Sequence, residues 1–110
     1  MDINSALSAF DALSQQARLE AYRLLVRAGP AGMPAGEIAT RLDVRQNTMS
    51  AHLAVMLHAG LVQRQREGRV IRYSVDIDAM RALLAFMLED CCGGNPALCQ
   101  PIIEEVACAC

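Results

Sequence analysis

The sequence predicts a mainly α-helical protein that carries one β-hairpin, a fold of the α+β class. Three observations lead to this prediction. Apolar residues recur at helical spacing over much of residues 3–61. Two β-leaning arms then surround Glu67-Gly68, a pair that suits a tight hairpin turn. The helix expected after the hairpin is apolar on nearly every side, because only Arg81 is polar among residues 79–88.

Two helices are expected in the N-terminal part. Ile3–Leu13 is predicted as the first, and residues 15–29 as the second, with Ser14 as its N-cap. Gly29-Pro30 should stop this second helix. Residues 31–36 contain two glycines and a proline, so they are expected to be a connector.

A helix, turn, helix arrangement is predicted next. Residues 37–42 should form a short helix, Asp43-Val44 should turn the chain, and residues 46–61 should form another helix. One stripe of this later helix carries Met49, Leu53, Met56 and Gly60, with Gly60 placed to end it.

The hairpin that follows is predicted to be a wing, which makes the whole arrangement a winged helix-turn-helix. One face of the first arm carries Val62, Arg64 and Arg66, and one face of the second carries Ile71, Tyr73 and Val75. Arginines therefore lie near the hairpin tip. Asp76 or Asp78 can cap the next helix.

The apolar helix at residues 79–88 predicts an α-helical dimer interface. In so small a protein, a helix that is apolar all round is covered by another chain or leaves a large exposed patch. We therefore expect a two-fold homodimer built on this helix and the first one. After it, the cysteine-rich tail should break helical structure at Gly93-Gly94, Pro96 and Pro101.

Positive charge is concentrated in one part of the chain, although the net charge is −2. Residues 41–72 hold six arginines against two acidic residues, which gives +4 and leaves −6 for the rest. A local positive field attracts phosphate, so double-stranded DNA is an expected partner; an ordinary solvated arginine surface is the alternative.

No apolar run could span a bilayer and the N-terminus lacks a secretory pattern, so we expect a cytoplasmic protein without a membrane partner.

The segment EIATRLDVRQNTMSAHLAVMLHAGLVQRQREGRVIRYSV resembles the ArsR/SmtB family of metal-responsive repressors over its whole length. The matching features are the small-residue turn before the recognition helix, Ser50, His52-Leu53, residues 59–62 and the 66–73 wing. The resemblance implies a dimeric winged helix that binds operator DNA without inducer and releases it when inducer binds. Residues 1–90 would form the DNA-binding and dimerisation domain, and residues 91–110 the inducer-binding tail.

The resemblance also allows the family's sensing sites to be tested residue by residue. The cysteine cluster that some members carry before the recognition helix is absent, because GMPAGEIA stands there. The histidines of the zinc site on the last dimer helix are absent from DAMRALLAFMLED. Cys91, Cys92 and Cys99 instead resemble the arsenic-responsive subgroup that senses at the end of this helix.

Candidate DNA contacts fall on the recognition helix and the wing. Side chains in the first two turns of such a helix reach base edges, and arginines neutralise phosphates. The base-reading candidates are Gln46, Asn47, Thr48, Ser50 and His52, and the phosphate candidates are Arg45, Arg64, Arg66, Arg69 and Arg72. Capping or satisfaction in the core remains the alternative for Thr48, Ser50 and His52.

The three cysteines predict a soft inducer, As(III) or Sb(III), with no organic cofactor. Arsenous acid condenses with three neutral thiols, so no thiolate charge has to be kept beside Glu89-Asp90. Zinc or cadmium would need a fourth ligand, for which Cys108 and Cys110 are candidates. A thiol-redox repressor, a metal buffer without a DNA role and merely packed cysteines also remain open. No phosphate loop or catalytic triad is present, so an enzyme is not expected.

Overall fold

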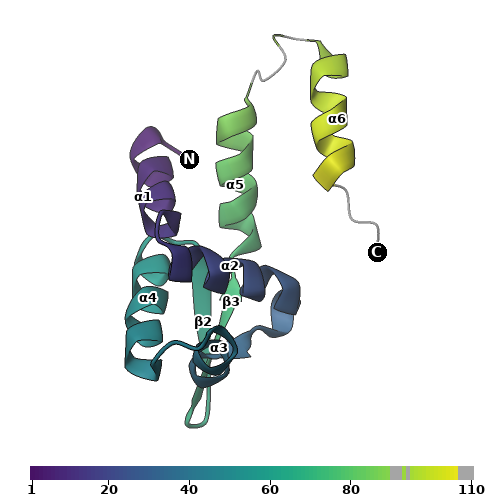
Figure 1. The fold of residues 1–110 in the computed structure, drawn as a ribbon. Coiled ribbons are helices and arrows are strands. Elements are labelled where there is room, and N and C mark those ends of the chain that lie inside the picture. Colours follow the sequence, from purple (N-terminus) through teal and green to yellow (C-terminus); the bar gives the residue numbers. More distant parts are fainter. Residues whose placement is uncertain (90–92, 94, 107–110) are drawn as a thin grey trace.

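The computed structural model describes residues 1–89, 93 and 95–106. Figure 1 shows α1 and α5 rising at one end of the molecule and the hairpin tip at the other. The elements in chain order are α1 (Ile3–Leu13), α2 (Gln16–Ala28), a 3-10 turn (Gly29–Ala31), β1 (Met33–Pro34), α3 (Ala35–Leu42), α4 (Gln46–His58), β2 (Val62–Glu67), β3 (Val70–Val75), α5 (Ile77–Leu88) and α6 (Pro96–Val106). The mainly helical class with a β wing is confirmed.

The core forms where the apolar faces of the first four helices meet the sheet. The buried residues of helix α1 are all small, Ala6, Ala9 and Ala12, and the partly buried Leu13 also packs against the core. The predicted stripe of α4 is confirmed, since Met49, Leu53 and Met56 have no exposed surface. Gly60 follows the end of α4 with a φ of 80°, a value that glycine adopts easily.

The predicted N-cap of α2 is wrong by one residue. Ser14 lies at the C-terminal end of α1, and its hydroxyl donates to the carbonyl oxygen of Asp11 at 2.8 Å. Gln15 caps α2 instead, because its Oε1 accepts from the backbone N–H of Arg18 at 2.9 Å. Two helices end and begin within three residues here, so the serine satisfies the first helix rather than the second.

The connector expected at residues 31–36 contains a strand and the start of a helix. Met33 and Pro34 form β1, which pairs with β3 at Tyr73 and Arg72, and α3 begins at Ala35. The sheet order is β1-β3-β2, so proline occupies an edge strand, where its missing N–H is tolerated. Two residues are too few to show strand alternation, which is why the sequence pattern did not indicate β1.

The hairpin is confirmed, but its turn lies one residue later than expected. Glu67 pairs with Val70, so Gly68-Arg69 forms the two-residue turn, and Gly68 has a φ of 64°. The same register puts Arg64 opposite Tyr73 and Arg66 opposite Ile71. The predicted faces of the two arms are therefore one face of the sheet, buried at its base and exposed toward the tip.

The C-terminal helices correct one expectation and confirm another. Asp76 caps α5 as predicted, because its Oδ1 accepts from the backbone N–H of Ala79 at 3.0 Å. The expected break at Pro101 is wrong, since α6 contains this proline, whereas Pro96 begins α6 and so lies at a helix boundary. Proline suits the first position of a helix, where its N–H would have no partner, and Pro101 removes a single internal bond.

Candidate DNA-binding surface and inducer site

Helix α4 presents a polar edge to solvent at its first two turns. Its apolar stripe holds the helix against the core, which leaves the positions between the stripe residues outside. The candidates Gln46, Asn47, Thr48 and Ser50 are all exposed. Arg45, also exposed, is the N-cap residue of this helix. Four of the five base-reading candidates thus share one accessible end of α4.

His52 is placed differently from these four residues. Its side chain is half-buried, and its Nδ1 lies 3.5 Å from a guanidinium nitrogen of Arg18 on α2. This position fits the alternative of satisfaction in the core. The sequence did not single out Arg18, because an isolated arginine on an amphipathic helix carries no local signal of such a contact.

The wing supplies four of the five phosphate candidates, and these arginines differ in how far their charge is already compensated. Arg64, Arg66 and Arg69 are exposed, and Arg66 donates to the carbonyl oxygen of Gly68 at 3.0 Å. Arg72 is half-buried and lies 3.6 Å from the carboxylate of Glu67. Within the described part of the chain, Arg45, Arg64 and Arg69 form no ion pair.

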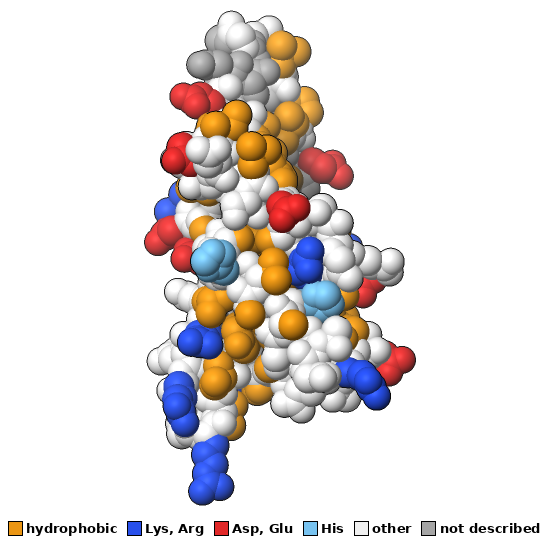
Figure 2. Space-filling model, turned by 90° about the vertical axis from the view of Figure 1, so that its left-hand side faces the viewer, with side chains coloured by type: hydrophobic (Ala, Val, Ile, Leu, Met, Phe, Trp, Pro, Cys, Tyr) orange, Lys and Arg blue, Asp and Glu red, His pale blue; other side chains and the backbone are white. Residues whose placement is uncertain are grey.

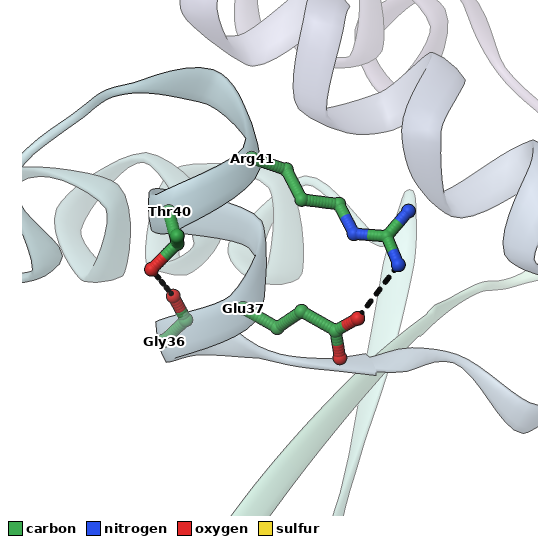
Figure 3. Close-up of polar contacts among 4 residues, drawn as sticks. All are labelled: Gly36, Glu37, Thr40 and Arg41. Atoms are coloured by element: carbon green, nitrogen blue, oxygen red, sulfur yellow. Dashed lines mark hydrogen bonds and ion pairs between the residues drawn. The ribbon is translucent and has the colours of Figure 1, made fainter.

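A contrasting arginine lies on α3. Figure 3 shows Arg41 turned back along its own helix onto Glu37, with 2.8 Å between guanidinium nitrogen and carboxylate oxygen. The neighbouring Thr40 hydroxyl donates to the carbonyl oxygen of Gly36 at 3.0 Å. The charge of Arg41 is therefore paired inside α3, whereas Arg45 at the start of α4 and Arg64 and Arg69 on the wing form no ion pair among the described residues.

The start of α4 and the wing border a common pocket of 340 Å³. Its wall includes Gln46 and Ser50 from α4, Arg69 from the hairpin turn and Tyr73 from β3. Figure 2 shows arginines gathered at the wing end of the molecule and most acidic side chains toward the opposite end. The start of α4 and the wing thus share one surface that carries polar and basic side chains, which suits a polyanion.

A separate apolar surface lies on α1 and α5, away from the wing. Leu83 is the buried residue of α5, while Leu84 and Met87 are each 46% exposed. On α1, Leu7 is 59% exposed and Phe10 is 41% exposed. The apolar excess predicted for residues 79–88 is confirmed as exposed surface on α5.

The cysteines are described only in part. Cys99 lies in the first turn of α6, is half-buried and is disulfide-bonded. The predicted ligands Cys91 and Cys92 lie outside the described residues, as do Cys108 and Cys110. The described residues hold no group of three possible metal ligands. The oxidised state of Cys99 was not anticipated from the sequence, which favoured thiol or metal chemistry.

Comparisons with known proteins identify the family. A helix-turn-helix domain family matches residues 13–65. The chain is 30% identical to the ArsR-like transcriptional regulator from Rhodococcus sp. RHA1, with 97% of this chain and 96% of that chain covered and a TM-score of 0.68. The protein belongs to the ArsR family of transcriptional regulators. Residues 13–65 span α2, α3, α4 and much of β2, so the family match covers the helical part of the basic surface.

Two further comparisons also find regulators that are similar to this ArsR-family protein. It is 26% identical to the homodimeric winged helix-turn-helix DNA-binding domain of a possible ArsR-family regulator from Mycobacterium bovis, with 78% of each chain covered and a TM-score of 0.66. It is also 26% identical over 97 residues to the transcriptional activator HlyU of Vibrio cholerae, covering 86% of this chain and 87% of that protein. These relatives are regulators, and this protein is likewise a regulator with a DNA-binding domain, not an enzyme. Among its described helices, none is long and apolar enough to cross a membrane.

Proposed function

We propose that this ArsR-family regulator is a homodimeric repressor that leaves its operator when As(III) or Sb(III) binds Cys91, Cys92 and Cys99. The observation that supports DNA binding best is the shared surface of α4 and the wing, where Gln46, Ser50 and Arg69 border one pocket. That surface joins groups that read bases to groups that neutralise phosphate, as operator binding requires.

On this proposal α4 enters the major groove by its N-terminal end. Gln46 or Asn47 can form paired hydrogen bonds with adenine, and Thr48 or Ser50 can bond either a base or a phosphate. The flexible, uncompensated guanidinium groups of Arg64 and Arg69 reach the phosphates on either side of the groove. Ser50→Ala and Gln46→Ala should each lower affinity about 5- to 100-fold for a preferred duplex and much less for random DNA.

The apolar surface of α1 and α5 supports the dimer. Burying Leu7, Phe10, Leu84 and Met87 against a second copy removes large exposed apolar side chains from water. A two-fold axis at this end presents two copies of α4 to successive major grooves, about 34 Å apart along the duplex. A small change in the angle between subunits then alters the spacing of the two α4 helices and weakens binding.

The inducer proposal rests on sulfur chemistry. Three thiols replace the three hydroxyl groups of arsenous acid, which releases three waters and leaves a neutral, pyramidal As(S)3 centre. Cys99 enters this chemistry only after a thiol reductant has reduced its disulfide, with the reductant itself oxidised to a disulfide. Binding would draw the first turn of α6 toward the end of α5 and so act on the dimer surface.

The test uses fluorescence anisotropy on a duplex that the reduced native protein selects from a random pool. Arsenite should release the native protein, and a dithiol chelator of arsenic should restore binding. Cys99→Ser should bind the duplex like the native protein and ignore arsenite. If Cys99→Ser stays fully inducible, the three-cysteine site is wrong. Transcription from a promoter carrying the selected sequence checks the sign of regulation, because the relative HlyU is described as an activator.

A second candidate is a thiol-redox regulator on the same fold. The disulfide at Cys99 favours it, because thiol–disulfide exchange at this sulfur would be the sensing chemistry. The same anisotropy assay separates the two functions. Release of the native protein by an oxidant, with a metal chelator present and no response of the reduced protein to arsenite, would establish redox sensing. For either function we expect the protein to act in the cytoplasm.

A further inference from the structure

The side chain of Arg18 joins three helices near the middle of the molecule. Its Nε donates to the carbonyl oxygen of Ala12 at 2.6 Å, at the end of α1. Its terminal nitrogen lies 3.5 Å from Nδ1 of His52 on α4, the outer limit of a hydrogen bond. Its own backbone lies in the first turn of α2, where Gln15 accepts from its N–H.

The chemistry of this position suits arginine. Ala12 lies in the last turn of α1, where carbonyl oxygens have no partner within the helix and the helix dipole favours a cation. The planar guanidinium group donates in two directions at once, so it can satisfy this carbonyl and still face the imidazole ring. A lysine has a single flexible ammonium group and cannot hold the same two partners in fixed directions.

The partners of Arg18 belong to the two surfaces of the molecule. Helix α1 carries Leu7 and Phe10 on the exposed apolar surface. Helix α4 carries Ser50 on the DNA-binding surface, two residues before His52. A change in the position of α1 therefore reaches α4 through one side chain, in addition to the packing between the two helices.

We propose that Arg18 is a positioning residue that fixes the angle of α4 against α1 and carries changes at the dimer surface to the DNA-binding surface. This inference rests on the proposed reading of DNA by α4. It makes His52 an intermediate partner rather than a base-reading residue.

The test is a double-mutant cycle on affinity for the selected duplex, with the reduced native protein as reference. Arg18→Met keeps the aliphatic length and should weaken binding about tenfold, as should His52→Leu. The double variant should be no weaker than about tenfold, because both changes break the same contact. His52→Asn keeps an acceptor near the Nδ1 position and should recover most of the lost affinity.

Arg23→Met is the matched control, because Arg23 is an exposed arginine on the same helix. It removes the same charge and should leave affinity within about twofold of native. The dependence of log affinity on log salt gives a readout that separates positioning from DNA contact. Arg18→Met should keep the native slope, whereas loss of a phosphate contact would reduce it by about 0.9.

Three results would overturn the inference: additive single effects, a reduced salt slope for Arg18→Met, or equal losses for Arg18→Met and Arg23→Met. Circular dichroism establishes whether Arg18→Met folds; if it does not, the contrast between His52→Leu and His52→Asn decides. The proposed function fails separately, if Ser50→Ala and Gln46→Ala leave binding of the selected duplex unchanged.

Discussion

The winged helix part, from α1 to β3, and the C-terminal helices α5 and α6 differ in how their apolar residues are covered. In α4, the apolar stripe has no exposed surface, so the chain's own packing fixes this helix. In α5, Leu83 is buried while Leu84 and Met87 remain exposed, and on α6 Leu98 is 62% exposed. The core of the first part is covered by its own chain, although Leu7 and Phe10 of α1 stay exposed. The second part has apolar surface left over, which is the property expected of a segment that works against another molecule.

The largest expected effect follows directly from this difference. Leu53→Ala should lower the free energy of unfolding by about 2–5 kcal/mol, because it leaves a cavity in a fully packed core. Leu98→Ala removes the same atoms from an exposed site on α6. This variant should change the free energy of unfolding by about 0.5 kcal/mol or less. Chemical denaturation of both variants measures the contrast. Equal losses would mean that α6 is packed as tightly as α4.

A smaller but specific effect is expected on assembly. Leu84→Glu should raise the dimer dissociation constant about 30-fold or more, because a carboxylate would replace apolar contact in the proposed interface. Ile102→Glu is the matched change on α6, because the exposed fraction of Ile102, 44%, is similar to the 46% of Leu84. It should leave the dimer intact. Sedimentation equilibrium measures both, and a monomeric Ile102→Glu protein would move the interface to α6.

The two kinds of arginine should differ in the salt dependence of duplex binding. Arg64→Met should reduce the slope of log affinity against log salt by about 0.9, because an uncompensated guanidinium group would lose its phosphate. Arg41→Met should reduce it less, since Glu37 lies 2.8 Å from that group. Anisotropy titrations at several salt concentrations give both slopes. The opposite ranking would place the phosphate contacts on α3 rather than on the wing.

The smallest effect concerns the start of α1. Hydrogen bonds from Ser5 lower the pKa of the Asp2 carboxyl group. The bond from the Ser5 backbone N–H has the larger effect, and the bond from the Ser5 side chain has the smaller one. The stability that this cap contributes is therefore complete above the unfolded pKa of about 3.9 and is lost as the pH falls through the lowered folded value. Asp2→Asn should flatten this acid-side loss, and Asp11→Asn serves as the charge control. NMR titration of Asp2 with an unshifted pKa would rule the effect out.

Local patterns predicted the parts of the fold that local forces determine. The bounds of α1, the buried stripe of α4 and the Asp76 cap of α5 all follow from spacing and capping chemistry. The two-residue strand β1 could not be predicted, because its pairing partner Tyr73 is far away in the sequence. The helix break predicted at Pro101 is wrong, because the remaining backbone hydrogen bonds keep α6 helical although Pro101 lacks a donor.

The candidate site divides in the same way. Their place in the first two turns of the predicted recognition helix made Gln46, Asn47, Thr48 and Ser50 candidates, and all four are exposed. The orientation of His52 toward Arg18 depends on how α2 crosses α4, a tertiary feature without a sequence pattern. The binding of one ion by Cys91, Cys92 and Cys99 remains a prediction from chemistry, because Cys91 and Cys92 lie outside the described residues.

The most direct test of the account measures the affinity of arsenite for the reduced protein, free and bound to the selected duplex, at the same salt concentration. Linkage requires that DNA weaken arsenite binding by the factor by which arsenite weakens DNA binding, about 5- to 150-fold for a typical coupling. We expect that reciprocal loss. Equal arsenite affinity for the free and DNA-bound protein would contradict it.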